Sequence, residues 1–215
     1  MIEINTIYKT IMGEISDWPQ GIPVTIIRFQ GCSKNCKWCD TKEAQKKGDG
    51  ILMSISEIME SVAMFGSRQI LITGGEPLEQ RKEFMKLHSH LTKLYDIAVE
   101  TNGYHDIPRL FNTTWIMDWK PDISNKSKEY SKQINRAIWN ADYVKFLIYD
   151  RADFDNAKLV KKEIEQESGV SVLFSAIVHK GMNNKLLCKW MLEDNSLDDC
   201  YLNVQIHKLI GLKEK

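Results

Sequence analysis

The stretch IPVTIIRFQGCSKNCKWCDT, residues 22–41, joins an apolar run to a loop that carries three cysteines. Residues 22–29 are rich in Val and Ile, which is typical of a buried strand. Cys32, Cys36 and Cys39 follow within eight positions, and no fourth cysteine lies nearby in the sequence. Structural zinc sites and ordinary ferredoxin-type clusters both close with four protein ligands. Three thiols directly after a strand therefore indicate a metal centre with one coordination position left open.

The same kind of apolar run recurs along the chain, at residues 69–73, 97–101, 114–119, 142–149, 170–178 and 201–206. Between these runs lie segments with helical spacing, at residues 54–66, 79–95, 152–168 and 183–194, with a weaker one at 126–140. This alternation predicts an α/β fold with a mostly parallel sheet. In such folds the chemistry sits at the carboxyl ends of the strands, which is where the cysteines lie.

Composition narrows the class of protein. The chain has 215 residues and 43% hydrophobic residues, so we expect one folded domain over residues 1–215. Lys plus Arg and Asp plus Glu balance at 29 each, which argues against nucleic acid as a partner. The start, MIEINTIYKT, lacks the pattern of a signal peptide, and no run is long enough to span a membrane. We therefore expect a cytoplasmic protein whose cysteines bind metal or stay free, Cys188 and Cys200 among the latter.

The cysteine loop leaves alternatives open. Three unrelated thiols, or a zinc knuckle completed by a distant His, would also fit the spacing. Asp40 either caps a turn or contributes to a site. The Thr41 hydroxyl is either structural or a hard oxygen ligand suited to Mg²⁺ beside a substrate carboxylate. The neighbouring Lys46 and Lys47 are expected to lie in solvent.

A second motif, TGGEP at residues 73–77, follows the second apolar run. Gly74 and Gly75 allow close approach of the backbone to a ligand, and the Glu76 carboxylate can receive an ammonium group. A pair of glycines before a helix is equally able to serve only as a turn. Together with the cysteine loop, the motif favours a ligand site.

These two motifs resemble those of the radical S-adenosylmethionine (SAM) superfamily. The resemblance implies that Cys32, Cys36 and Cys39 bind a [4Fe–4S] cluster and that SAM chelates the open iron. It also implies that the GGEP segment holds the methionine amino group of SAM. A 5′-deoxyadenosyl radical would then abstract a hydrogen atom, while the protein orients the parts.

The order of TIMGE (10–14), IIRFQGC (26–32), CDT (39–41), TGGEP (73–77), ETNG (100–103) and NVQIHK (203–208) is similar to that of the 7-carboxy-7-deazaguanine synthase family. This resemblance implies an abbreviated, partial (β/α) barrel and a lyase-type reaction of queuosine biosynthesis. The family converts 6-carboxy-5,6,7,8-tetrahydropterin by ring contraction and loss of ammonia. The resemblance also implies Mg²⁺ as a cofactor, a homodimer, and a reducing protein such as flavodoxin or ferredoxin as a partner.

The resemblance also implies site residues. Arg28 would meet the substrate carboxylate with its two-pronged guanidinium, although a surface or strand-edge arginine is the alternative. Thr41 would bind Mg²⁺. The remaining implied substrate contacts are Ile11, Met12, Gly13, Glu14, Thr73, Gln205 and His207, the last of which has a purely structural alternative. The implied SAM contacts are Lys37, Trp38, Asp40, Gly74, Gly75, Glu76, Asp118, Trp119, Lys120 and Ser175.

The chain departs from the family pattern at Met12, where Gln is usual, and at Ile15, where Gly is usual. The residues at the end of the apolar run 114–119 and after it, DWKPDISNK (118–126), also differ from the family pattern. Three other functions therefore stay open. They are a glycyl-radical-activating enzyme that acts on a partner protein, an electron-transfer or iron–sulfur sensing module, and a synthase for an altered pterin or purine.

Overall fold

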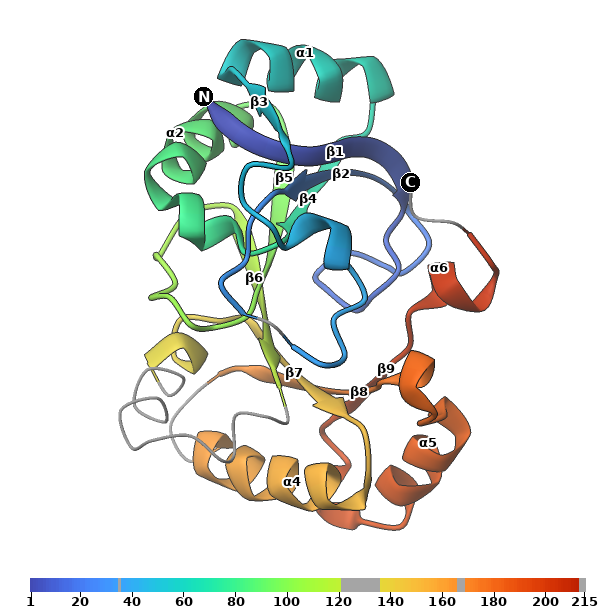
Figure 1. Ribbon diagram of the computed structural model, residues 1–215. Helices are drawn as coiled ribbons and strands as arrows, with labels where there is room; N and C mark the ends of the chain where they lie inside the picture. The colour runs from blue at the N-terminus through green and yellow to red at the C-terminus, as the bar shows by residue number, and fades with distance from the viewer. Residues whose placement is uncertain (35, 121–135, 166–168, 213–215) are drawn as a thin grey trace. The chain divides into compact units, whose positions relative to one another are not determined.

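The computed structural model describes residues 1–34, 36–120, 136–165 and 169–212. The chain divides into two compact units. The first consists of Met1–Thr101, Arg109–Thr114 and Ile206–Lys215. The second consists of Asn102–Pro108 and Trp115–Gln205. Figure 1 shows the path of the chain within each unit.

The sheet of the first unit combines parallel and antiparallel pairing. Across it the strands are ordered β3 (Ile51–Met53), β1 (Ile2–Ile11), β2 (Pro23–Phe29), β4 (Gln69–Gly74) and β5 (Asp96–Thr101). The β2–β4 and β4–β5 pairs are parallel, as predicted. Strand β1 runs antiparallel to both β2 and β3. The parallel strands bring the ends of β2 and β4 side by side, where the two motifs begin.

Strands β1 and β3 are missing from the sequence prediction. In β1 the apolar alternation is interrupted, because the pairing register with β2 shifts between Ile4 and Thr6. A bulge of this kind places two residues opposite one and breaks the period-2 pattern. Strand β3 is three residues long and lies at the edge, with Ile51 65% exposed. Neither strand therefore shows the buried apolar run that marks the others.

The first helix of this unit begins and ends where its capping residues predict, whereas the second differs from the prediction. Helix α1 (Ile55–Phe65) starts at Ser54, whose hydroxyl accepts the Glu57 amide N–H, and ends at Gly66 with φ 64°. The segment predicted at 79–95 instead forms a 3-10 turn, η2 (Pro77–Gln80), followed by α2 (Arg81–Leu91). The short C-terminal helix α6 (Ile206–Leu209) also belongs to this unit.

The second unit holds parallel strands with helices between them. Its strands are ordered β6 (Thr113–Trp119), β7 (Tyr143–Ile148), β8 (Ser171–Ala176) and β9 (Tyr201–Asn203). Its helices and 3-10 turns are α4 (Arg151–Glu165), η4 (Val178–Lys180), α5 (Asn184–Leu192) and η5 (Asn195–Leu197). Most of the weak helix predicted at 126–140 falls on residues 121–135, outside the described residues. The predicted fold class, α/β with mostly parallel strands, is confirmed.

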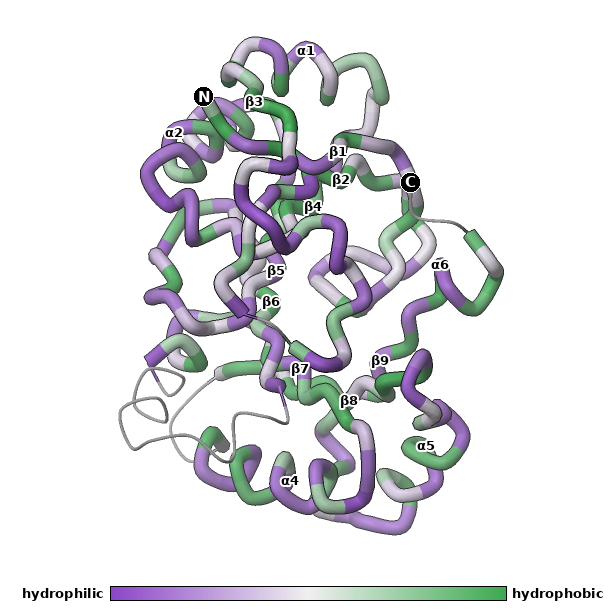
Figure 2. The backbone as a smooth tube through the Cα atoms, viewed as in Figure 1, coloured by the Kyte–Doolittle hydropathy of each residue, from purple (hydrophilic) through white to green (hydrophobic). Residues whose placement is uncertain are grey.

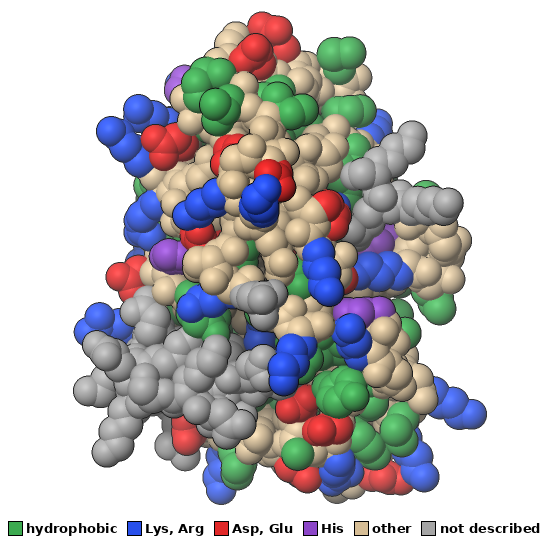
Figure 3. Space-filling view, in the orientation of Figure 1, with side chains coloured by type: hydrophobic (Ala, Val, Ile, Leu, Met, Phe, Trp, Pro, Cys, Tyr) green, Lys and Arg blue, Asp and Glu red, His purple; other side chains and the backbone are tan. Residues whose placement is uncertain are grey.

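Apolar side chains make up most of the interior of each unit. In the second unit the ring centroids of Phe146 and Phe174 are 5.5 Å apart, as are those of Phe154 and Phe174. Helix α4 alternates between hydrophilic and hydrophobic residues along its turns (Figure 2). Side chains of both charge signs occur on the visible face in Figure 3. In the described part of the chain, no helix has the length and apolar character needed to cross a bilayer.

Candidate functional site

The loop after β2 carries the three cysteines. Cys32, Cys36 and Cys39 form no disulfide bond and are half-buried, and the Cys39 amide N–H donates to the Cys36 carbonyl at 3.2 Å. Between β2 and β3 the described residues hold one regular element, the 3-10 turn η1 (Lys42–Ala44). The sulfur atoms therefore lie on irregular backbone at the carboxyl end of a parallel strand, as the sequence predicts.

The base of this loop is closed by hydrogen bonds. The Cys32 amide N–H donates to the Gln45 carbonyl at 2.8 Å. Gln30 is 1% exposed, and its side-chain amide donates to the carbonyls of Glu43 at 3.0 Å and Lys46 at 2.7 Å. These contacts hold the two ends of the loop together, so its middle is presented from a fixed base.

The TGGEP motif forms a corner that packs against the end of β2. Gly74 has φ 122°, and a Cβ atom on it would lie 2.4 Å from the Phe29 carbonyl oxygen. A Cβ atom on Gly75 would lie 2.1 Å from the Gly31 carbonyl oxygen. The Gly75 amide N–H already donates to Phe29 at 2.9 Å. The close backbone approach that the sequence predicts is therefore made to the protein itself at both glycines.

Glu76 has a structural task in this corner. Its side chain is fully buried, and Oε1 accepts the Leu78 amide N–H at 3.0 Å and the Thr101 hydroxyl at 2.8 Å. The carboxylate thus caps η2 and links it to the end of β5. Its assignment to the ammonium group of SAM stays a prediction.

A row of polar side chains crosses the parallel strands one residue before they reach the corner. Arg28 on β2 pairs in register with Thr73 on β4, and the Thr73 hydroxyl donates to Glu100 on β5 at 2.7 Å. Arg28 is 4% exposed. Its guanidinium donates to the Tyr8 hydroxyl at 3.0 Å and lies 3.4 Å from the Glu43 carboxylate. Since β2 lies between β1 and β4, the alternative of a strand-edge arginine is wrong.

Tyr8 and Glu100 are absent from the predicted site. Glu100 had a sequence signal, because it opens the ETNG segment at the end of a parallel strand. Tyr8 had none, because the strand that carries it was not predicted. Both contact a predicted substrate residue directly.

The N-terminal stretch and the C-terminal QIHK segment meet in the first unit. A Cβ atom on Gly13 would lie 1.7 Å from Nδ1 of His207, and the Ile206 amide N–H donates to the Gly13 carbonyl at 3.0 Å. His207 is 9% exposed and Met12 is fully buried. Glu14, next to Gly13, is buried as well. The imidazole ring of His207 therefore takes the space that a side chain at position 13 would need.

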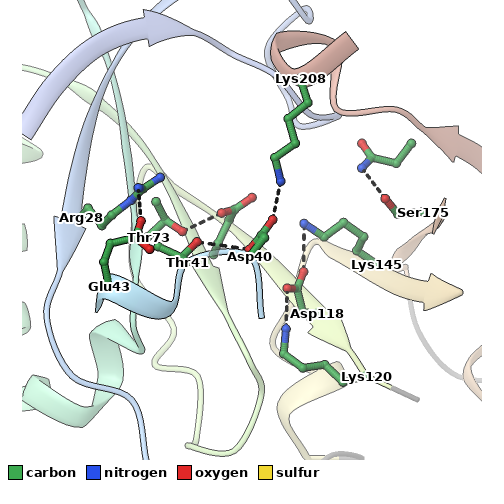
Figure 4. Close-up of polar contacts among 12 residues, drawn as sticks. Arg28, Asp40, Thr41, Glu43, Thr73, Asp118, Lys120, Lys145, Ser175 and Lys208 are labelled. Carbon is green, nitrogen blue, oxygen red and sulfur yellow. Dashed lines mark hydrogen bonds and ion pairs between the residues drawn. The ribbon is translucent and has the colours of Figure 1, made fainter. Parts of the chain in front are cut away.

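Asp40 and Thr41 offer oxygen atoms beside each other. The Thr41 hydroxyl donates to Asp40 Oδ1 at 3.2 Å, and Asp40 Oδ2 accepts from the Lys208 ammonium (Figure 4). Hydroxyl and carboxylate oxygens are ligands that Mg²⁺ accepts, so this pair fits such an ion. On the same loop Lys37 is exposed and Trp38 is half-buried.

The second unit has its own buried charge group. Asp118 on β6 lies 2.9 Å from the ammonium groups of both Lys145 and Lys120 (Figure 4). Burial alone would raise the pKa of Asp118, but the two lysines hold it below its usual value. Trp119 packs edge-on against Phe146, with ring centroids 5.2 Å apart. Asp118 is therefore charged and fixed, and Trp119 is a core residue.

Ser175 and Gln205 complete the predicted residues of the second unit. The Asn203 side-chain amide donates to the Ser175 hydroxyl at 3.2 Å, and both residues are buried. Gln205 is half-buried, two residues after the end of β9.

The donor set of the cysteine loop fits an iron–sulfur cluster. Burial raises the pKa of the Cys32 thiol to about 11, so metal binding there must displace a proton. Within the described ranges, no three His, Cys, Asp or Glu side chains gather in a way that would hold a metal ion. A cubane takes one thiolate on each of several irons, so its ligands need not converge on one point.

The chain is similar to known proteins in sequence and in fold. A family model described as the radical SAM superfamily matches residues 26–116, which contain the cysteine loop, the corner and the polar row. A 7-carboxy-7-deazaguanine synthase from Koribacter versatilis is 30% identical over 99% of this chain and 98% of that protein. The chain belongs to the 7-carboxy-7-deazaguanine synthase family. A synthase of the same name from Clostridium acetobutylicum is 32% identical over 86% of this chain and 85% of that protein.

The chain is also similar in fold to a solved structure. A crystal structure of QueE from Escherichia coli superposes with a TM-score of 0.74, covering 95% of this chain and 93% of that chain. At 21% identity this match shows the fold alone. Membership of the 7-carboxy-7-deazaguanine synthase family confirms the predicted family and its radical SAM enzyme class. The roles of individual residues stay predictions.

Proposed function

We propose that this chain converts 6-carboxy-5,6,7,8-tetrahydropterin to 7-carboxy-7-deazaguanine with loss of ammonia, as a radical SAM lyase of 7-deazapurine (queuosine-type) biosynthesis. The observation that carries the proposal is 30% identity to a synthase of that name over 99% of the chain. The register of Arg28 with Thr73, directly before the cysteine loop and the corner, adds local support.

Cys32, Cys36 and Cys39 are proposed to hold the [4Fe–4S] cluster. When bound, the cluster and SAM supply the 5′-deoxyadenosyl radical. The corner is proposed to border SAM. Because the Gly75 N–H already donates to Phe29, Gly75 would contact SAM through its carbonyl oxygen. The other proposed SAM contacts are Lys37, Trp38, Asp40, Gly74 and Glu76 in the first unit and Asp118, Trp119, Lys120 and Ser175 in the second.

Arg28 is proposed to bind the substrate carboxylate, because a guanidinium can donate two parallel hydrogen bonds to it. The Tyr8 hydroxyl holds one of its nitrogens at 3.0 Å, which orients the rest of the group. Thr73 and Glu100 would offer a hydroxyl and a carboxylate to the heterocycle. The other proposed substrate contacts are Ile11, Met12, Gly13, Glu14, Gln205 and His207.

Met12 bears on which heterocycle is accepted. Its side chain is fully buried, its amide N–H donates to Ile22, and its carbonyl accepts from Gly21, both at 2.8 Å. Where the family usually has Gln, this position therefore offers no side-chain hydrogen bond. A substrate with one polar group fewer at that edge is the second candidate.

Thr41 is proposed to bind Mg²⁺. Replacing it with Ala should lower turnover about tenfold at limiting Mg²⁺, because a hard oxygen ligand is lost. Iron content should stay at the wild-type value. Thr41→Ser, which keeps the hydroxyl, is the matched control. Equal loss of iron and turnover in the Ala variant would instead make Thr41 a structural residue.

The remaining assignments follow from the family resemblance. We propose a single radical SAM domain over residues 1–215, a homodimer in the cytoplasm, and reduction by a protein such as flavodoxin or ferredoxin. The balanced charge of 29 basic and 29 acidic residues supports the expectation that nucleic acid is not a partner.

A glycyl-radical-activating enzyme is not favoured, because the relatives that match almost the whole chain are named as synthases. An electron-transfer or sensing module would leave the Arg28–Thr73–Glu100 row without a substrate. Both alternatives predict that no small-molecule product forms.

An anaerobic assay tests the proposal. The chain is reconstituted with iron and sulfide and given SAM, Mg²⁺, a strong reductant and 6-carboxytetrahydropterin, and the products are identified by mass spectrometry. We expect the ring-contracted deazaguanine, with SAM not consumed in proportion. Accumulation of 5′-deoxyadenosine without it would contradict the substrate assignment, and intact SAM would contradict the radical chemistry.

A further inference from the structure

Glu79 lies in η2, directly behind the TGGEP corner, and belongs to none of the motifs. Its side chain is 5% exposed. Its carboxylate accepts the amide N–H of Ser33 and lies 2.8 Å from the ammonium group of Lys47. Ser33 follows Cys32, and Lys47 lies at the far end of the loop. One buried carboxylate therefore binds both ends of the cysteine loop to the corner.

Lys47 reaches Glu79 by crossing Gly31. A Cβ atom on Gly31 would lie 2.8 Å from Cγ and 3.3 Å from Cε of Lys47, and Gly31 has φ 96°. The methylene groups of the lysine thus take the space above the glycine. The side chain of Lys47 is 63% exposed, as expected, although its ammonium group is paired with Glu79. Lys46 forms a surface pair with Asp49 at 2.8 Å.

The Ser33 amide group lies next in the chain to the Lys34 amide group, which contacts the Cys32 sulfur. The Lys34 backbone N–H donates a hydrogen bond to the Cys32 sulfur. The two peptide groups share the Ser33 Cα atom, so fixing the first restricts the rotation of the second. Hydrogen bonds of this kind to cluster sulfurs are among the features that set reduction potentials.

We propose that Glu79 is a positioning residue, which, with Lys47, fixes the Cys32–Lys34 backbone so that the Cys32 sulfur is held ready for a cluster. The proposal rests on the proposed function, since it concerns the same loop. Glu79 itself touches neither substrate nor reacting atoms in this account. It acts through Ser33.

The charge of Lys47 is part of this arrangement. The Glu79 side chain is only 5% exposed, and a buried carboxylate is costly to leave charged without a partner. Lys47 offsets the charge of Glu79. Removing the lysine alone should therefore harm cluster binding more than removing both charges together.

The experiment compares full-length Glu79→Leu, Glu79→Gln, Lys47→Met and the Lys47→Met/Glu79→Gln double variant with wild type. Two quantities are measured: the alkylation rate of Cys32 in the apo-protein, by peptide mass spectrometry, and iron and sulfide per chain after reconstitution. Glu79→Leu should raise the alkylation rate about tenfold, because a charge-assisted hydrogen bond is lost, and should lower retained iron. Glu79→Gln keeps an acceptor for Ser33 and should stay within about threefold of wild type.

Asp49→Asn is the matched control, because it removes a carboxylate from an exposed ion pair of the same loop. It should leave both readouts at wild-type values. If Glu79→Leu does not fold, the charge pair decides the matter: the double variant should retain more iron than Lys47→Met. Wild-type values for Glu79→Leu in both readouts, or a double variant no better than Lys47→Met, would overturn the proposal.

The outcomes also separate the two proposals. If wild type assembles a cluster and forms product while Glu79→Leu matches it, the positioning role alone fails. If wild type takes up no cluster, the proposed function fails and the cluster-positioning role falls with it, even where Glu79→Leu still raises the alkylation rate of Cys32.

Discussion

The corner after β4 and the cysteine loop after β2 follow neighbouring parallel strands, yet they use their motif residues in different ways. In the corner, Gly75 and Glu76 make hydrogen bonds within the protein, with Phe29, Leu78 and Thr101. In the loop, other residues make the contacts that hold the backbone on which the three half-buried cysteines lie. A motif can therefore be scaffold in one region and the proposed ligand set of a metal centre in the next.

This difference has a physical reason. A corner that fixes the ends of two strands needs dense packing, which glycine permits. A loop that receives a metal centre needs its side chains available and its backbone held from outside. Here that support comes from Gln30 and from the Glu79–Lys47 pair.

The largest expected effect breaks the corner. Gly75→Ala places a Cβ atom 2.1 Å from the Gly31 carbonyl oxygen, which should lower the free energy of unfolding by about 3 kcal/mol. Urea unfolding of the apo-protein measures it. Gly169→Ala is the control, because nothing lies within 4 Å of its added Cβ atom, and it should be close to neutral. A wild-type midpoint of urea unfolding for Gly75→Ala would show that the backbone of the corner can shift to accommodate the added Cβ atom.

A smaller effect is expected where the corner and the loop meet the polar row. Arg28→Lys should raise KM about tenfold, because an ammonium group cannot make the two-pronged contact with a carboxylate. Glu43→Gln removes the neighbouring charge but keeps the arginine, and should change KM less. Steady-state kinetics separates the two variants. An unchanged KM in Arg28→Lys would remove Arg28 from the carboxylate site.

A change of a different kind, in thiol reactivity, is expected in the loop without its cluster. The pKa of Cys32 is raised from 9.0 to about 11, chiefly by burial. A raised thiol pKa leaves less thiolate below it, so alkylation of Cys32 at pH 8 should be roughly 100-fold slower than for an unshifted thiol. The rate should climb with pH until about 11. Ordinary reactivity of Cys32 at pH 8 would mean that the loop opens in the apo-protein.

The sequence predicted those parts of the fold and site that depend on neighbours along the chain. The buried strands, the capping of α1 at Ser54 and the position of the cysteines after β2 are of this kind. The bulge after Ile4 concealed β1 and, with it, Tyr8. The Glu79–Ser33 contact was also beyond prediction, because it joins segments far apart in the chain and Glu79 has no motif.

One paired measurement on Cys36→Ala and Gly75→Ala distinguishes the roles of the loop and the corner: iron per chain after reconstitution and the unfolding free energy of each apo-protein. Cys36→Ala should lose the cluster while its unfolding free energy stays within about 0.5 kcal/mol of wild type. Gly75→Ala should show the large loss of unfolding free energy. Wild-type iron content in Cys36→Ala, or a destabilisation as large as that of Gly75→Ala, would contradict the division into ligand loop and scaffold corner.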